Sequence, residues 1–301
     1  EAGAIGLLGG AAGCLVSFAV SLGMNLVEPA ALRKNKVCAV FSLEMPRIQI
    51  VQRLLCSYAN VSMAKGLSGQ LSASEWKKLM LASDKLKKSQ IYIDDSSRVT
   101  PAEILSKCRR LKSRKEGLDI IMIDYIQLMG SGERRSEENR QQEIASITRN
   151  LKIMAKELDV PVLALSQLRR ISSKEEPQLS DLRESGAIEQ DADMVMFIHR
   201  PDVAATEEEI KSGKIIKDAA DLIIAKHRNG ELGRVKLRFR GDQVRYVNPP
   251  PGFLPDEPDE ERHSGAEESD EEDRFDASYD DALDSFGEPP DEELPPDEED
   301  L

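Results

Sequence analysis

Apolar residues follow two patterns along this chain: short continuous runs, and longer segments with helical spacing. The continuous runs are typical of strands buried on both faces of a sheet. They predict strands at residues 37–43, 91–93, 119–123, 160–165, 194–198 and 222–225. The periodic segments predict helices at residues 47–57, 71–88 and 144–158. Strands that alternate with helices indicate an α/β fold with a doubly wound, mostly parallel sheet.

Local signals add one helix start and one strand pair. Thr100, Pro101 and Glu103 supply an N-cap, a first-turn proline and the glutamate of a capping box, so a helix is expected to begin there. Near the end of the ordered pattern we expect an antiparallel pair of strands at residues 235–239 and 244–247.

The N-terminal segment carries no charge from residue 2 to residue 27, so a membrane span has to be weighed. The stretch is long enough to span a bilayer, but it is rich in glycine and no basic flank precedes it. We therefore favour a buried strand, a glycine-rich turn and a helix. The chain begins at Glu1 and not at methionine, which leads us to expect a fragment with its upstream part missing.

Charge divides the chain into two parts. It has 41 Lys and Arg against 55 Asp and Glu, a net charge of −14. Residues 251–301 hold 23 acids and two bases, so residues 1–250 carry a net charge of +7. A basic body can bind a polyanion. Prolines and acids dominate residues 249–301 without apolar periodicity, which predicts a disordered acidic tail.

The cysteines suggest no special chemistry. Cys14, Cys38, Cys56 and Cys108 are far apart in the sequence, with no C-x-x-C pair and no histidine nearby. We expect neither a disulfide framework nor a zinc site, which fits a reducing cytoplasm. Cys38 and Cys56 lie in apolar stretches and are expected in the core.

Polar residues with catalytic potential follow three of the predicted strands. Asp124 ends the strand at 119–123, Glu44 follows the strand at 37–43, and Gln167 follows a third strand. Ligands of open α/β sheets bind at the carboxyl ends of the strands. A carboxylate there can hold Mg²⁺, a second can polarise water, and an amide can bond to a γ-phosphate. Each residue alone is also compatible with a helix or turn cap.

A basic turn at residues 226–230 follows the strand at 222–225. Alternation places Lys226 and Arg228 on one side, with His227 opposite, so the two cations can face a phosphate. A solvated turn is the alternative.

Two polar stretches, expected to be a loop and a long connection, are rich in arginine: residues 130–139 and 169–190. Such segments can follow a nucleic-acid backbone. Because interleaved aromatic residues are lacking, any contact is expected without sequence preference.

These motifs together resemble the ATPase domain of bacterial DnaB-type replicative DNA helicases. The resemblance covers about residues 24–248 in order and at the family spacing, and the run at 180–193 is its most specific part. It rests on residues 41–45, 123–129, 138–144, 165–168, 180–193 and 226–230. The resemblance implies a RecA-like P-loop NTPase fold with a mostly parallel sheet flanked by helices. A recombinase-like filament protein, which shares this fold, is a weaker alternative, and the run at 180–193 argues against it.

The resemblance also implies roles for individual residues. Glu44 would activate water, Asp124 would be the Walker B residue acting on Mg²⁺, and Gln167 would sense the γ-phosphate. Arg228 would be the arginine finger that contacts the ATP bound to a neighbouring subunit, and Lys226 would lie beside it.

Its further implications concern DNA and partners. Arg183, Glu184 and Gly186 would lie in a loop that contacts the DNA backbone. A homo-hexameric ring would bind ATP at its subunit interfaces and single-stranded DNA in its channel, and primase and a helicase loader would be partners. The location expected is the cytoplasm.

The chain departs from this family at its start. The family has a P-loop, G-x-x-x-x-G-K-[ST], which cradles phosphates. No such spacing of glycines occurs here, and no lysine precedes Lys34. Counting back from residues 41–45 without gaps places the expected lysine near Ala19 and the hydroxyl residue near Val20. The match breaks upstream of Met24, and the family's N-terminal helical domain is absent from this sequence.

Three accounts are compatible with this break. The P-loop has decayed in a pseudo-ATPase, the opening residues are scrambled by a reading-frame fault, or an altered loop binds nucleotide weakly. The abruptness of the break favours the second account. We expect an ATP-dependent helicase motor domain at residues 24–248, between a divergent segment at 1–23 and the tail at 249–301. The alternative is a ring subunit or single-strand binder without ATPase activity.

Overall fold

The chain divides into two compact units, Glu1–Leu254 and Pro255–Leu301. The computed structural model describes only residues of the first unit, namely 4–9, 14–130, 137–168, 175–182 and 186–254. The expected disorder of the acidic tail beyond Leu254 therefore falls outside the described residues. The three segments expected from the sequence, at residues 1–23, 24–248 and 249–301, remain predictions.

A single mixed sheet of nine strands forms the centre of the described part of the chain, in the order β3-β2-β4-β5-β1-β6-β7-β8-β9. Neighbouring strands from β3 to β6 pair in parallel, and β7, β8 and β9 continue the sheet in antiparallel fashion. The strands are β1 (Ala4–Gly9), β2 (Cys38–Ser42), β3 (Ile91–Asp94), β4 (Ile120–Asp124), β5 (Val162–Gln167), β6 (Met194–His199), β7 (Ala219–His227), β8 (Gly233–Arg240) and β9 (Arg245–Val247).

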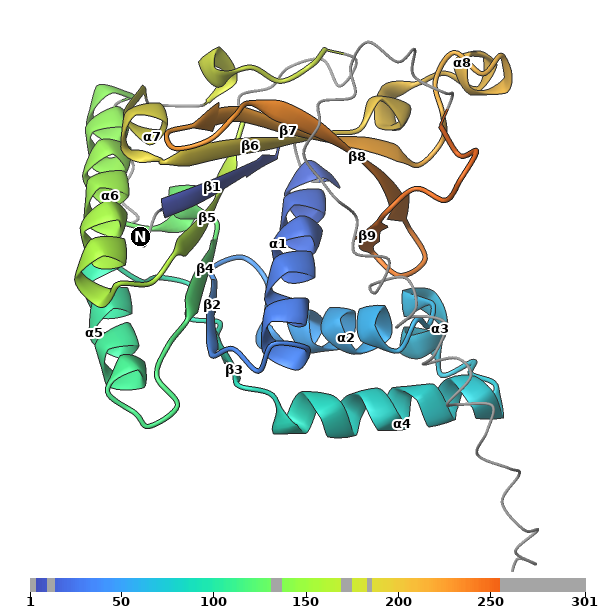
Figure 1. Cartoon of the computed structure of the whole chain (residues 1–301), viewed down its shortest axis with the longest axis horizontal. Helices are drawn as coiled ribbons and strands as arrows, with labels where there is room; N and C mark the ends of the chain where they lie inside the picture. The colour runs from blue at the N-terminus through green and yellow to red at the C-terminus, as the bar shows by residue number, and fades with distance from the viewer. Residues whose placement is uncertain (1–3, 10–13, 131–136, 169–174, 183–185, 255–301) are drawn as a thin grey trace, which may run out of the picture. The chain divides into compact units, whose positions relative to one another are not determined.

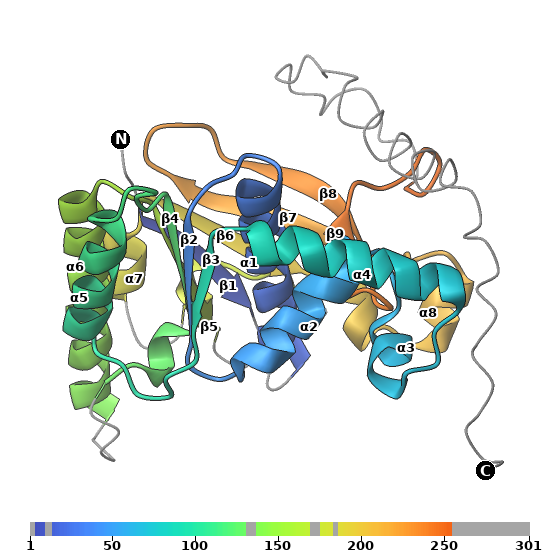
Figure 2. The ribbon, with the colours of Figure 1, turned by 90° about the horizontal axis from the view of Figure 1, so that it is seen from below.

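Helices cover both faces of this sheet, with α5 and α6 on one face and α1 on the other (Figure 1). Helices α2, α3 and α4 group together away from α5 and α6, as the view from below shows (Figure 2). The helices are α1 (Cys14–Leu32), α2 (Arg47–Tyr58), α3 (Met63–Ser68), α4 (Ala73–Lys88), α5 (Pro101–Lys112), α6 (Glu137–Leu158), α7 (Gly186–Asp191) and α8 (Glu207–Lys211). Short 3-10 turns lie at η1 (Ile126–Leu128), η2 (Leu179–Asp181) and η3 (Pro201–Ala204).

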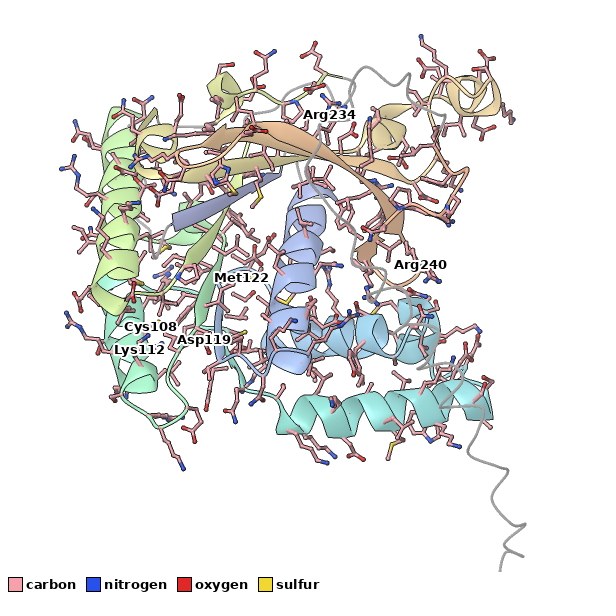
Figure 3. The ribbon with its side chains drawn as sticks, in the orientation of Figure 1. Cys108, Lys112, Asp119, Met122, Arg234 and Arg240 are labelled. Carbon is pink, nitrogen blue, oxygen red and sulfur yellow. The ribbon has the colours of Figure 1, made fainter. Side chains whose placement is uncertain are left out.

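The central strands are buried on both faces, which is why they have continuous apolar sequences. Ile121 and Ile123 pack toward α5 and α6, whereas Met122 packs toward α1. Figure 3 shows Met122 between β4 and α1. A Cβ atom at Gly23 of α1 would lie 2.5 Å from the Met122 Cε. The glycine therefore allows α1 to pack closely against the sheet.

Most predicted elements are confirmed, including the capping box at Thr100, the terminal antiparallel pair and the burial of Cys38 and Cys56. The N-terminal segment contains the expected strand and helix, β1 and α1. No helix in the described ranges is long and apolar enough to cross a membrane.

Two expected loops contain helices instead. Helix α6 begins at Glu137, inside the segment expected to be a loop, and α7 with η2 interrupts the expected long connection. Glutamates in a first turn suit the positive end of a helix dipole, so the polar composition at Glu137 was compatible with a helix. Helix α7 is too short for an apolar period to be visible, and only Ile188 in it is buried.

Candidate functional site

The ends of three parallel strands bring together the residues expected to handle ATP. Ser42 at the end of β2 is in register with Asp124 at the end of β4, and the Leu43 amide donates to the Asp124 carbonyl at 2.6 Å. Glu44 follows directly. Gln167 ends β5, which pairs with β4, so Glu44, Asp124 and Gln167 lie along the same edge of the sheet.

Asp124 is the most perturbed carboxyl group at this edge. It is 1% exposed, and among the described residues neither of its carboxylate oxygens has a hydrogen-bond partner. Burial and the negative charge of Glu44 raise its pKa to about 7, against the opposing influence of Arg53 and Ser42. The Ser42 hydroxyl is thus close to the carboxylate, but it forms no hydrogen bond of good geometry with it.

Arg53 is a site residue that the sequence did not indicate. It lies on α2, and its charge acts on both Asp124 and Glu44. Burial lowers its pKa, and one of its guanidinium nitrogens is buried without a partner in the described structure. The only signal in the sequence was a cation between Ile50 and Leu54 on the buried side of the helix.

Gln127 joins the ends of β4 and β5. Its amide nitrogen donates to the Ser166 hydroxyl at 2.8 Å and to the Gln167 carbonyl at 3.2 Å. Its amide oxygen accepts from the Gln167 backbone N–H at 3.1 Å. Arg140 of α6 in turn donates to the Gln127 carbonyl and to Glu143. Gln127 was part of the family motif, but only the fold reveals what it contacts.

Strand β1 ends at the edge of the sheet where such a fold has its phosphate loop. Gly9 at the end of β1 is in register with Gln167, so the chain enters residues 10–13 at the same edge of the sheet. These four residues are not described. Ala19 and Val20, where counting placed the lysine and the hydroxyl residue, instead lie within α1, and Val20 is buried in the core.

Lys226 and Arg228 lie together at the end of β7, on the same side, as alternation predicted. The strand extends to His227, beyond the expected end at residue 225. Lys226 donates to the Ala192 carbonyl at 2.8 Å and to the Glu189 carbonyl. Arg228 donates to the Gln190 carbonyl, and its guanidinium lies 3.4 Å from the Asp193 carboxylate. Both cations therefore hold the C-terminal end of α7.

Helix α7 is also anchored from the other side. Thr148 of α6 donates to Asp191 at 2.7 Å, and Lys152 of α6 pairs with Asp193. Gly186 is the first residue of α7. Arg183 and Glu184, the other residues expected to contact DNA, lie outside the described residues.

The residues at the strand ends fit a nucleotide-bound cation. A buried carboxylate without hydrogen-bond partners favours a cation, and a second carboxylate beside it can accept a proton from water. In the described ranges no three His, Cys, Asp or Glu side chains gather as a metal site. Asp124 would hold a Mg²⁺ ion through water, and the ion would take its direct ligands from water and phosphate, the usual arrangement for this ion.

Comparisons with family models and with known proteins indicate the same family. The sequence model of the family "DnaB-like helicase C terminal domain" matches residues 17–248 of this chain. Over 233 residues the chain is 47% identical to the replicative DNA helicase DnaB of Pasteurella multocida, covering 76% of this chain and 48% of the relative. For DnaB of Geobacillus stearothermophilus, the identity is 44% over 232 residues, covering 76% and 49%. The chain thus spans about half the length of these relatives.

Two solved structures have the same fold. One is described as an ATPase domain; it superposes with a TM-score of 0.73 at 32% identity, covering 82% of this chain and 85% of that one. A DnaB-like replicative helicase, described with its interactions with primase, superposes with a TM-score of 0.70 at 33% identity, covering 81% and 57%. The RecA-like fold expected from the sequence is confirmed.

Proposed function

This chain belongs to the DnaB-like helicase C-terminal domain family, and on that premise we propose that it is the motor domain of an ATP-dependent replicative DNA helicase. It would assemble as a homo-hexamer, translocate on single-stranded DNA and unwind duplex DNA. Primase and a helicase loader are the proposed protein partners. The observation that supports this most directly is the line of Glu44, Asp124 and Gln167 along one edge of the sheet.

Each of these residues has a role that its surroundings support. Asp124 would hold Mg²⁺ through water, because its buried carboxylate lacks other partners in the described structure. Glu44 is exposed beside it and would take the proton of the attacking water. Gln127 bonds to the Gln167 backbone, and the Gln167 side chain would bond to a γ-phosphate oxygen. ATP and Mg²⁺ supply the phosphoryl chemistry when bound.

Arg228 would act on the ATP of a neighbouring subunit. A planar guanidinium can stabilise the charge that spreads over the transferred phosphoryl group. Lys226 lies on the same side, and carbonyl groups of α7 accept hydrogen bonds from both side chains. Arg183, Glu184 and Gly186, which precede and begin α7, are the proposed contacts to the DNA backbone.

The missing P-loop lysine limits hydrolysis by this chain alone. Without that charge on the β- and γ-phosphates, we expect turnover lower than in an intact relative by roughly 10²–10⁴. The measurement is the steady-state ATPase rate of the purified chain with single-stranded DNA. A rate near that of the intact relative would contradict this expectation.

A mixed-ring experiment tests the motor assignment independently of that defect. The chain is mixed with subunits of an intact relative whose own finger arginine has been replaced by alanine. Hydrolysis at the relative's sites should then be restored, because a finger donated in trans increases the rate by roughly 10³–10⁵.

Two variants serve as controls for this rescue. Arg228→Ala should abolish it, and Arg228→Lys should restore little, since an ammonium group cannot reproduce the planar fork. Crosslinking has to demonstrate that mixed rings form. If they form and hydrolysis stays absent, Arg228 is not a finger, and Lys226 and Arg228 serve only to hold the end of α7.

A further inference from the structure

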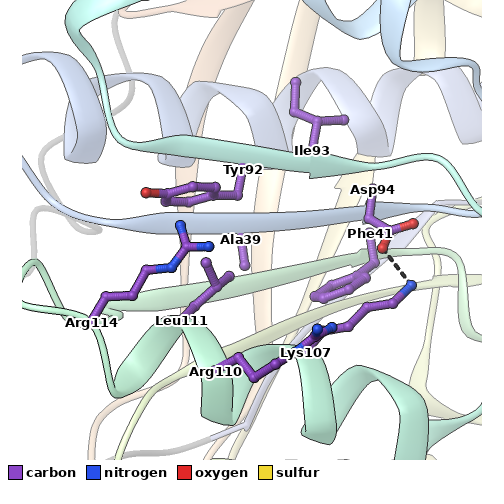
Figure 4. Close-up of a pocket in the computed structure, with 9 residues that line it drawn as sticks. All are labelled: Ala39, Phe41, Tyr92, Ile93, Asp94, Lys107, Arg110, Leu111 and Arg114. Carbon is purple, nitrogen blue, oxygen red and sulfur yellow. Dashed lines mark hydrogen bonds and ion pairs between the residues drawn. The ribbon is translucent and has the colours of Figure 1, made fainter.

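A cavity of about 310 Å³ lies away from these residues, between the strands β2 and β3 and helix α5 (Figure 4). Ala39 and Phe41 of β2 and Leu111 of α5 give it an apolar lining. Phe41 is buried, so the inner end of the cavity is apolar. Because β3 is the last strand on this side of the described sheet, the cavity lies at the edge of the fold.

Cations line the exposed side of this cavity. Lys107 is neutralised by Asp94, whose carboxylate lies 2.6 Å from the Lys107 Nζ and also accepts from Ser96. Arg114 is exposed, and its guanidinium lies 5.4 Å from the centre of the Tyr92 ring. Arg110 is exposed and has no acidic partner within the described ranges. Among the described residues, neither Arg110 nor Arg114 therefore has a carboxylate that compensates its charge.

The position of these arginines on the helix restricts the ligand. Cations near the C-terminal end of a helix are common, because they complement its dipole. Arg110 and Arg114, however, also border an apolar cavity. Cations that only stabilise the helix dipole would not need such a cavity beside them. Phosphate sites usually use backbone N–H groups at helix N-termini. At the C-terminal end of α5 the backbone presents carbonyls instead, so an anion at this opening has to be bound by the guanidinium groups themselves.

We propose that this cavity binds an acidic peptide segment of a partner protein. One bulky apolar side chain of the peptide enters the cavity against Phe41 and Leu111, and carboxylates on either side of it pair with Arg110 and Arg114. Charge complementarity supports this occupant: the opening carries two guanidinium groups without a carboxylate partner in the described ranges, and each can bind a carboxylate in a bidentate manner. Arginine and aromatic residues are also those enriched where proteins bind one another.

The test uses the full chain and a fluorescent, capped Asp-Glu-Phe-Glu-Asp peptide, with binding followed by anisotropy at low salt. We expect saturable binding that weakens on the order of tenfold with Arg110→Glu and clearly with Arg110→Ala. Replacing the phenylalanine of the peptide by alanine should weaken binding similarly. All protein variants keep residues 255–301, so any effect of that acidic segment is common to them.

A matched control separates the cavity from general surface charge. Lys115→Glu makes the same charge change on an exposed residue just outside the cavity, and it should leave the affinity within about twofold at moderate salt. The proposal is overturned if the peptide shows no saturable binding, or if Lys115→Glu weakens it as much as Arg110→Glu. It is also overturned if adenosine monophosphate, and not the peptide, binds in an Arg110-dependent way. None of these outcomes depends on the proposed helicase activity.

Discussion

At the scale of single residues, the buried carboxyl of Asp124 links the proposed function to stability. Its pKa of about 7 in the folded chain lies well above the ordinary value, so folding favours its protonated form. Between about pH 4 and pH 7 the unfolded chain loses this proton while the folded chain keeps it. Asp124 should therefore lower the free energy of unfolding as pH rises through that window, by at most about 4 kcal/mol.

Replacing this carboxyl tests that statement. Asp124→Asn should flatten the pH dependence of the unfolding free energy and raise stability at pH 8 relative to the parent chain, as measured by urea denaturation across pH 4.5–8. Asp84→Asn, an exposed carboxyl paired with Lys87, is the control and should leave the slope unchanged. A parent slope that persists in Asp124→Asn would mean that another group is responsible.

At the scale of elements, one substitution can test how much the capping box at the start of α5 contributes to stability. Thr100 accepts from the Glu103 amide at 3.3 Å, and Glu103 accepts from the Thr100 amide at 2.8 Å. Thr100→Ala removes the side-chain half of this capping box and should cost about 1 kcal/mol in the free energy of unfolding.

The same helix supplies the control for this change. Ser106 is exposed in the middle of α5, where alanine is the better helix former, so Ser106→Ala should be neutral or slightly stabilising. Denaturant unfolding of the two variants gives the comparison. Equal effects of the two substitutions would show that the cap contributes nothing at this position.

The elements differ in how visible they are in the sequence. The strands β2 and β4 are visible because burial on both faces requires continuous apolar residues. Helix α6 is visible from its apolar stripe but not in its first turn, where Glu137 and Glu138 are compatible with either a loop or a helix start. Short elements such as α3 and α7 have too few residues for a period to emerge.

At the scale of the whole molecule, charge asymmetry should control DNA affinity. Residues 255–301 carry all 23 acids of the tail and its two bases. Removing this segment therefore changes the net charge from −14 to +7. Deleting this segment should tighten binding to single-stranded DNA at low salt, because the deletion removes negative charge that repels phosphate.

Salt dependence is the signature of this effect. The gain in affinity should shrink as the salt concentration rises from about 50 to about 300 mM, since screening weakens long-range repulsion. Fluorescence titration of a labelled oligonucleotide measures both chains under identical conditions. Unchanged affinity at low salt would identify the segment as a passive solubilising tail.

The sequence by itself determined the layered α/β architecture, the family and the strand ends at which Glu44, Asp124 and Gln167 occur. Periodicity and motif spacing are local properties, and they are enough for these conclusions. The family resemblance and the RecA-like fold are confirmed.

Only the tertiary structure decided which distant residues meet. Arg53 acts on Asp124, Gln127 bonds to the end of β5, and Lys226 holds the end of α7. Each of these contacts joins parts of the chain that are far apart in the sequence, so no local pattern can specify them. The raised pKa of Asp124 likewise depends on burial and on neighbouring charges, which exist only once the sheet and its helices have packed.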